Sequence, residues 1–379
     1  MADREADIIA RIARGVADLG ADQWNGLAGP YDPFVGHSFL SLLEQSGSIG
    51  EGSGWTPLPV LVERESRVTA AAPAYLKTHS QGEYVFDHGW ADAWERAGGN
   101  YYPKLQVAVP FTPCVGPRLL GDDRNALLAA LETVTVQNQL SSAHITFLTD
   151  EETKAAEARG WLRRDGLQFH WFNRGYASFD EFLAALSSRK RKAIRKERAA
   201  AIEGLEIVAL RGAAIEPAHW DAMWNFYQHT GARKWGRPYL TRAFFDGVGQ
   251  AMGGSALMFL ALDNGRPIAG ALNFIGGDTL YGRYWGAVDD RQFLHFELSY
   301  YRAIDWVIDH GLATIQAGAQ GEHKLARGYE PVITPSVHFL PDPGFRRAVA
   351  DFLDREREAI RLELEWARQA LPYRSDSSP

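Results

Sequence analysis

The sequence predicts an α/β protein made of two tandem units, each a mixed sheet flanked by helices, with one further helix at the C-terminus. Strand-like runs of alternating apolar residues are interleaved with amphipathic helical segments along the whole chain. A segment near residue 158 also recurs near residue 326, which indicates an internal duplication. The 379 residues, 46% of them apolar, are enough for two domains with separate cores.

The first half of the chain predicts one domain, residues 1–172. The hairpin LPVLVERESRVTAAAPAYL turns at Glu65 and Ser66, and the strand-like LQVAV follows it. A helix near residues 123–138 comes next. The strand AHITFL, the helical DEETKAAEA and the strand LQFHWF complete this domain.

The second half predicts a domain over residues 173–345. A capping box from Ser178 to Glu181 starts one helix, and a basic helix over residues 187–203 follows it. The segments ALMFLALD, PIAGALNFIG and TLYGRYWGAV, joined by the turns NGR and GGD, predict a three-stranded meander. A long helix over about 293–310 then ends at Gly311. ATIQA and PSVHFL predict two further strands, and residues 346–379 predict a charged amphipathic helix and tail.

The duplication rests on two segments with the same spacing. ARGWLRRDGLQFHWF begins at residue 158 and ARGYEPVITPSVHFL at residue 326, an offset of 168 residues (326 − 158 = 168). Ala-Arg-Gly, an aromatic residue and a histidine, either His170 or His338, recur at this offset. We therefore expect the two halves to share one α/β unit.

Composition excludes several classes of protein. The net charge of −7 argues against a globally basic nucleic-acid coat. The single cysteine, Cys114, excludes an internal disulfide and a cysteine-rich zinc site, and we expect it to be a small buried thiol. The histidines lack metal-ligand spacing, so we predict no metal. No apolar run approaches the ~20 residues of a membrane span, and the charged N-terminus is unlike a secretory signal, so we expect a cytoplasmic protein.

The stretch GAQGEHKLARGYEP, residues 318–331, predicts a catalytic loop. Residues 322–324 have no counterpart in the first copy, as expected of a site added to one copy only. His323 is the candidate acid-base catalyst because imidazole titrates near neutral pH, and the flanking Glu322 and Lys324 are expected either to orient its ring or to bind a substrate carboxylate or phosphate. The alternative is a solvated loop, or packing shared by both copies. The expected substrate-binding residues of the stretch are Gln320, Lys324, Arg327 and Tyr329.

The long helix gives a further catalytic candidate. At ~100° per residue, Glu297 falls within the apolar arc of the helix, where a carboxylate is either paired with a cation or has a raised pKa suited to a general base. A buried structural glutamate is the alternative, and His295, on the polar arc, is expected to be exposed. Tyr284 and Trp285, in YGRYWG, are expected to border a substrate-binding cleft.

The basic helix predicts a phosphate-binding surface. Six cations on about half of its circumference suit a polyphosphate, RNA or an anionic headgroup, although a solvated face is the alternative. The residues concerned are Arg189, Arg191, Lys192, Arg195, Lys196 and Arg198.

Several of these segments resemble the FemAB-like family of N-acyltransferases, labelled peptidoglycan biosynthesis or recognition proteins. They are YWG, LHFELSYYRAIDWVIDHG, GAQGEHKLARGYEP and SSRKRKAIRKER. The resemblance implies two tandem GNAT-like units and transfer of an acyl or aminoacyl group to an amine, on a small-molecule or peptide acceptor such as a cell-wall precursor. It implies an activated ester or thioester donor, either aminoacyl-tRNA or acyl-CoA, and no tightly bound cofactor.

One segment departs from the acetyl-CoA pattern of GNAT enzymes, in which a Q/R-x-x-G-x-G/A loop holds the pyrophosphate. The nearest match, RYWGAV at residues 283–288, ends in valine and is followed by two aspartates that would repel a pyrophosphate. The donor therefore stays open. The alternative function is a non-catalytic recognition protein that binds a nucleic acid or cell-wall precursor through the basic helix and the C-terminal cleft.

Overall fold

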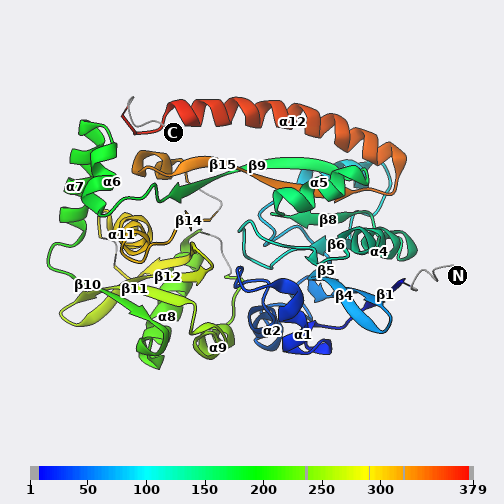
Figure 1. The fold of residues 1–379 in the computed structure, drawn as a ribbon, viewed down its shortest axis with the longest axis horizontal. Helices are drawn as coiled ribbons and strands as arrows, with labels where there is room; N and C mark the ends of the chain where they lie inside the picture. The colour runs from blue at the N-terminus through cyan, green and yellow to red at the C-terminus, as the bar shows by residue number, and fades with distance from the viewer. Residues whose placement is uncertain (1–7, 235–237, 290, 319–320, 375–379) are drawn as a thin grey trace, which may run out of the picture. The chain divides into compact units, whose positions relative to one another are not determined.

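The computed structural model describes residues 8–234, 238–289, 291–318 and 321–374 and divides into two compact units (Figure 1). The first contains residues 1–166 and 333–361, and the second contains residues 167–332 and 362–379. The chain passes from one unit to the other within β9 (Leu162–Phe172), β15 (Glu330–Phe339) and α12 (Pro343–Gln369). The expected domain boundaries, at residues 172 and 345, thus fall at the end of β9 and at the start of α12.

The first unit contains two sheets. One has the strand order β15-β8-β6-β5-β2, in which β6 and β8 are parallel and the other neighbours are antiparallel. The other has the order β1-β3-β4-β7. The predicted turn between β3 and β4 is present, with positive φ at Glu65 and Ser66. The strands are β1 (Ile8–Ile12), β2 (Trp55–Pro57), β3 (Val60–Arg64), β4 (Arg67–Ala72), β5 (Ala74–Lys77), β6 (Lys104–Val107), β7 (Leu120–Gly121) and β8 (Ala143–Thr146).

The core of the first unit lies between α4 and one face of the first sheet. Leu105, Val107 and Ile145 of the sheet pack with Leu127 and Leu131 of α4, and all five are fully buried. A capping box between Thr149 and Glu152 starts α5. The helices are α1 (Ala21–Ala28), α2 (His37–Gln45), α3 (His88–Arg96), α4 (Arg124–Gln137) and α5 (Asp150–Ala158), with a 3-10 turn, η1 (Val16–Asp18).

The second unit is built on one sheet with the strand order β10-β11-β12-β13-β14-β9. The predicted meander is confirmed as β11, β12 and β13, which are antiparallel. β14 is parallel to β13 and antiparallel to β9. The strands are β10 (Glu206–Arg211), β11 (Ala256–Asp263), β12 (Arg266–Gly276), β13 (Thr279–Ala287) and β14 (Thr314–Gln316).

The predicted long helix of the second unit is confirmed in extent, but one turn of it is π-helical. It consists of α10 (Leu294–Phe296), the π turn η3 (Glu297–Tyr301) and α11 (Arg302–Asp309), and Gly311 ends it with φ of +65°. The other helical segments are α6 (Phe179–Ala185), α7 (Ser188–Ala201), η2 (Gly212–Ala214), α8 (Pro217–Lys234), α9 (Arg242–Met252) and η4 (Glu322–Arg327).

The two repeated segments have the same local structure. Gly160 and Gly328 end α5 and η4 with φ of +88° and +82°, and a buried aromatic residue and a long strand follow each glycine. The strand order β5-β6-β8-β15 in the first unit repeats the pairing directions of β12-β13-β14-β9 in the second. Each unit therefore takes its last strand from the other repeat, which explains why both units are discontinuous in sequence.

Candidate active site

A cavity in the second unit lies where β13 and β14 separate. The two strands pair over three residues each, Thr279–Tyr281 and Thr314–Gln316, and β13 continues to Ala287 paired with β12. Its register against β12 shifts between Leu272 and Asn273, which makes Arg283 an extra residue in β13. A cavity of about 130 Å³ adjoins this irregularity, and its walls come from β12, β13, residues 295–300 and Ala317.

The cavity wall combines aromatic and polar side chains, as is usual for a small-molecule site. Tyr284 and Trp285, both predicted to border a cleft, are part of this wall. The polar members are Asn273, Arg283, His295, Ser299 and Tyr300. Ser299 Oγ is buried and has no hydrogen-bond partner among the described residues, so it is available to a bound ligand.

His323 contacts the cavity wall through Tyr300. The Tyr300 hydroxyl and His323 Nε2 share a hydrogen bond of 2.9 Å. Burial raises the pKa of Tyr300, so its hydroxyl keeps its proton at neutral pH. His323 itself is exposed, and the His295 ring lies 5.4 Å from Tyr300 and 6.0 Å from His323. His295, Tyr300 and His323 are thus neighbouring groups that can exchange protons, and they extend from the cavity wall to the protein surface.

Two cations predicted to bind substrate hold the loop around His323. Lys324 Nζ donates hydrogen bonds of 2.7 Å to the carbonyl oxygens of Ala317 and Gly318, and its side chain is buried. Arg327 donates to the carbonyl oxygen of His323 at 2.8 Å and lies 3.4 Å above the Phe296 ring. These contacts fix the backbone on both sides of the imidazole. Substrate binding by Lys324 and Arg327 stays a prediction.

The other predicted residues of this loop are placed as follows. Tyr329 is fully buried and packs edge-on against Tyr300, with ring centroids 5.4 Å apart. Gln320 and the side chain of Glu322 lie outside the described residues.

Glu297 is fully buried and paired with cations. Its two oxygens each accept a hydrogen bond of 3.0 Å from Arg198, and Arg302 Nε lies 2.8 Å from Oε1. Arg198 also donates to Asp305 at 2.6 Å. This geometry is that of the paired, structural glutamate, and a role as general base stays a prediction.

His295 is half-buried and lines the cavity, whereas the helical wheel predicted an exposed side chain. In the π turn over residues 297–301 each residue rotates the chain by less than the ~100° of an α-helix. Side chains before and after this turn therefore do not share the faces that a helical wheel assigns to them. The sequence pattern carries no signal for this turn. His295, Ser299 and Tyr300 were therefore missed as candidate site residues.

The basic helix α7 presents only part of its charge to solvent. Arg198 pairs with Glu297 and Asp305, Arg195 donates to Asp180 at 2.9 Å, and Arg191 donates to the carbonyl oxygen of Leu186 at 3.3 Å. An open groove beside α7 includes Phe179, Asp180 and Leu183. The exposed cations that remain for a phosphate-bearing ligand are Arg189, Lys192 and Lys196.

Two further sequence expectations concern metal and membrane. Over the described parts of the chain, no group of three or more His, Cys, Asp or Glu side chains is arranged to hold a metal ion. No helix in the same parts combines the length and apolar character that a bilayer crossing requires.

Comparison with known proteins places the chain in a family. The FemAB-like family, described as peptidoglycan biosynthesis/recognition, matches residues 15–375. No curated protein sequence matches the chain. The solved structure of FemX matches with a TM-score of 0.53 and 11% identity, covering 90% of this chain and 100% of FemX.

Two further solved structures are similar. A conserved protein of unknown function from Bacteroides thetaiotaomicron VPI-5482 gives a TM-score of 0.53 at 12% identity, covering 87% of this chain and 99% of that one. The C-terminal domain of a putative lysylphosphatidylglycerol synthetase from Agrobacterium fabrum gives 0.50 at 9% identity, covering 88% and 95%. At sequence identities this low, the similarity is evidence for the fold alone. The predicted class of two tandem GNAT-like α/β units with a C-terminal helix is confirmed. The protein therefore belongs to the FemAB-like family.

Proposed function

We propose that this protein is an N-acyltransferase or aminoacyltransferase that moves an acyl group from an activated ester or thioester donor to an amine. The observation that carries the proposal is the Tyr300–His323 hydrogen bond at the wall of the cavity beside β13. Membership of the FemAB-like family supports the same class of reaction.

The proposed chemistry begins with the amine acceptor, which arrives as an ammonium ion and must lose a proton before it can attack. The exposed His323 imidazole accepts that proton, while the Tyr300 hydroxyl fixes the orientation of its ring. The amine nitrogen then forms a bond to the carbonyl carbon of the donor. The attached nitrogen loses its second proton to water, the tetrahedral intermediate collapses with cleavage of the carbon–oxygen or carbon–sulfur bond, and the imidazolium returns its proton to the leaving group, so one proton is released to solvent per amide formed.

The cavity supplies a group for the negative charge on the intermediate. The Ser299 hydroxyl lies in the cavity wall, is buried and has no hydrogen-bond partner among the described residues, so it can donate to an oxyanion. A volume of about 130 Å³ accommodates a short acyl group, since a cavity of ~150 Å³ holds a benzene molecule.

The exposed face of α7 suits a phosphate-bearing donor, for which aminoacyl-tRNA and acyl-CoA are the candidates. Arg189, Lys192 and Lys196 would contact its phosphates. The acceptor is proposed to be a small-molecule or peptide amine, and the family description favours a peptidoglycan precursor. Both donors are cytoplasmic metabolites, so the reaction is proposed to occur there.

The test is single-turnover loss of a labelled acyl group from each donor in the presence of a panel of amines. His323→Ala should lower the rate by ~10² or more, the usual scale for a general acid-base group, and Tyr300→Phe should lower it less. The control is His310→Ala, because His310 is an exposed histidine that stacks on Trp306 and does not line the cavity. Unchanged transfer in folded His323→Ala would exclude the proposed role. Retention of a donor without any transfer by the wild type would favour the recognition protein.

A further inference from the structure

One face of the main sheet in the first unit is polar, although it is buried. In β6 and β8, Lys104, Gln106, His144 and Thr146 alternate with the apolar residues that pack on α4, and each of the four is at most 2% exposed. Such alternation is typical of a sheet with one face in water. Here the polar face is covered, because the segment over residues 78–87 and Trp90 of α3 contact it.

Two fully buried lysines lie directly opposite one another on this face. Lys77 of β5 pairs in register with Lys104 of β6, and both side chains are 0% exposed. Like charges in that position are unfavourable, and burial of each ammonium group costs several kcal/mol. Packing of the sheet alone therefore does not account for this pair. His144 and His338 continue the same face, with their Nδ1 atoms 2.6 Å apart.

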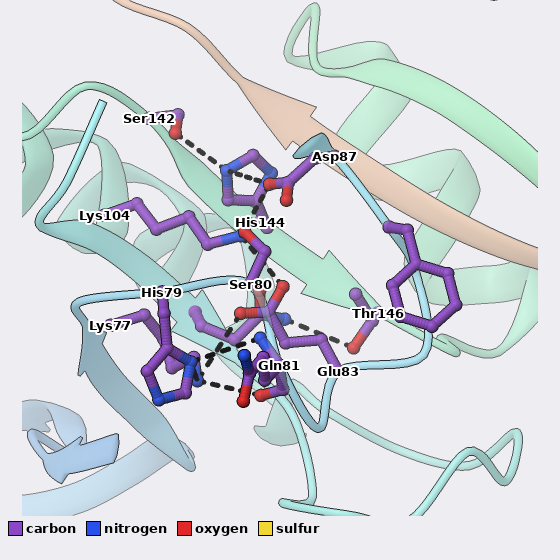
Figure 2. Close-up of polar contacts among 12 residues, drawn as sticks. Lys77, His79, Ser80, Gln81, Glu83, Asp87, Lys104, Ser142, His144 and Thr146 are labelled. Atoms are coloured by element: carbon purple, nitrogen blue, oxygen red, sulfur yellow. Dashed lines mark hydrogen bonds and ion pairs between the residues drawn. The ribbon is translucent and has the colours of Figure 1, made fainter. Parts of the chain in front are cut away.

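The carboxylates that neutralise the lysines come from one irregular segment, residues 78–87 (Figure 2). Lys104 Nζ donates to Glu83 at 2.8 Å, to Asp87 at 2.5 Å and to the Ser80 hydroxyl at 2.9 Å. Lys77 Nζ lies 3.7 Å from Glu83 and donates to the carbonyl oxygen of Gln81 at 3.0 Å. One lysine thus holds three residues of a segment that has no helix or strand of its own.

Both carboxylates fit this face incompletely. Asp87 Oδ1 and Gln106 Oε1 are buried and have no hydrogen-bond partner among the described residues, and Glu83 Oε1 has only the long 3.7 Å ion pair with Lys77 there. A structural ion cluster is expected to satisfy its buried oxygens, because each one left unpaired is costly. Carboxylate oxygens without full pairing, next to two lysines, are instead what we expect if Glu83 and Asp87 take the place of the anionic groups of a ligand.

The position of this polar face in the fold also indicates a ligand site. The parallel pair β6 and β8 in the first unit corresponds to the parallel pair β13 and β14 in the second, where the cavity lies. In register, His144 occupies the position of Gln316, and His338 that of His170. The polar face is therefore the counterpart, in the first repeat, of the candidate active site.

We propose that this face of the first unit is a second ligand site, for a small dicarboxylate, and that Glu83 and Asp87 occupy it in the closed form described here. Lys77 and Lys104 each bind one carboxylate of the ligand, and residues 78–87 move away as it enters. The Tyr101 hydroxyl, which donates to Asp87 at 2.6 Å, would donate to the ligand instead. The site does not depend on the proposed transferase activity.

The segment is held firmly at Asp87, where burial opposes ionisation but the ion pair with Lys104 keeps the pKa of the carboxyl well below its usual value, and more weakly at Glu83. Burial lowers the pKa of Lys77 to about 7 and raises that of Glu83 to about 7. Both shifts disfavour the charged forms, so this pair contributes less to holding the segment than a full ion pair would.

Hydrogen exchange of residues 78–87 in the full-length protein tests the proposal. Succinate at millimolar concentration should increase exchange of this segment in a saturable manner, whereas sodium chloride of equal ionic strength should leave it unchanged. Glu83→Gln removes one competing charge with little change in shape, and it should tighten succinate binding by about tenfold, or ~1.4 kcal/mol. Lys77→Met should abolish the response.

Three outcomes would overturn the assignment. No effect of succinate on wild-type exchange would leave the cluster as a structural one, and this measurement stands even if either variant does not fold. A response to inorganic phosphate alone would refute the dicarboxylate. Binding that is equally tight in wild type and folded Glu83→Gln would show that the segment does not compete for the site.

Discussion

Replacing Glu297 by glutamine separates a structural carboxylate from a catalytic one. The side chain is 0% exposed and accepts two hydrogen bonds of 3.0 Å from Arg198, with Arg302 at 2.8 Å. Glutamine keeps the size but offers one acceptor, so the guanidinium of Arg198 loses a charged partner in a buried setting. Removal of one member of a buried pair costs about 3 to 5 kcal/mol, and the retained acceptor places the expected loss near ~3 kcal/mol.

This loss should appear in chemical denaturation of the second unit and as a fall in Tm of about 6 to 12 °C. Asp305→Asn is the matched control, since Asp305 contacts the same arginine but is partly exposed, and about 1 kcal/mol is expected there. Acyl transfer by the folded fraction of Glu297→Gln should stay close to that of the wild type. Wild-type stability together with lost transfer would refute the structural interpretation and make Glu297 a base.

Two further predictions concern charge and pH. Replacing Arg189, Lys192 and Lys196 of α7 by glutamine should weaken tRNA binding and reduce the slope of log affinity against log salt by ~0.7 to 0.9 per lost contact; an unchanged slope would remove these cations from donor binding. Acid should destabilise the second unit through His170, because burial lowers its pKa to about 4, and only the unfolded chain binds a proton just below pH 6.5. The stability is complete above pH 6.5 and falls toward pH 4, by about 2 kcal/mol at pH 5. Urea titrations at pH 7.5 and 5 should show this loss in the wild type and not in His170→Asn, and an equal loss in both would contradict it.

Much of the local structure could be read from the sequence. The turn NGR between β11 and β12 has positive φ at Asn264 and Gly265, a conformation that these two residue types adopt at low cost. Gly311 ends the long helix for the same reason. The repeat at an offset of 168 residues also predicted two similar units, because it preserves the glycine, the aromatic residue and the strand pattern that follow each helical segment.

The candidate site was predicted in part. His323, Tyr284 and Trp285 were selected from a glycine-flanked loop and an aromatic strand, and the structure brings all three to the cavity or to a residue of its wall. Tyr300 and His295 were missed because a helical wheel assumes one constant period, and the π turn changes that period within the site.

The sequence by itself determined the meander, several turns and helix ends, and the presence of two repeats, since these depend on local patterns of residues. Only the tertiary structure decided which strand completes each unit and which charges are paired. Arg198 and Glu297 are 99 residues apart in sequence, and Lys104 meets Glu83 and Asp87 across a loop. Alternation in β6 and β8 is compatible with a polar face but does not indicate its burial, because whether a face meets water depends on segments that pack over it from elsewhere in the chain.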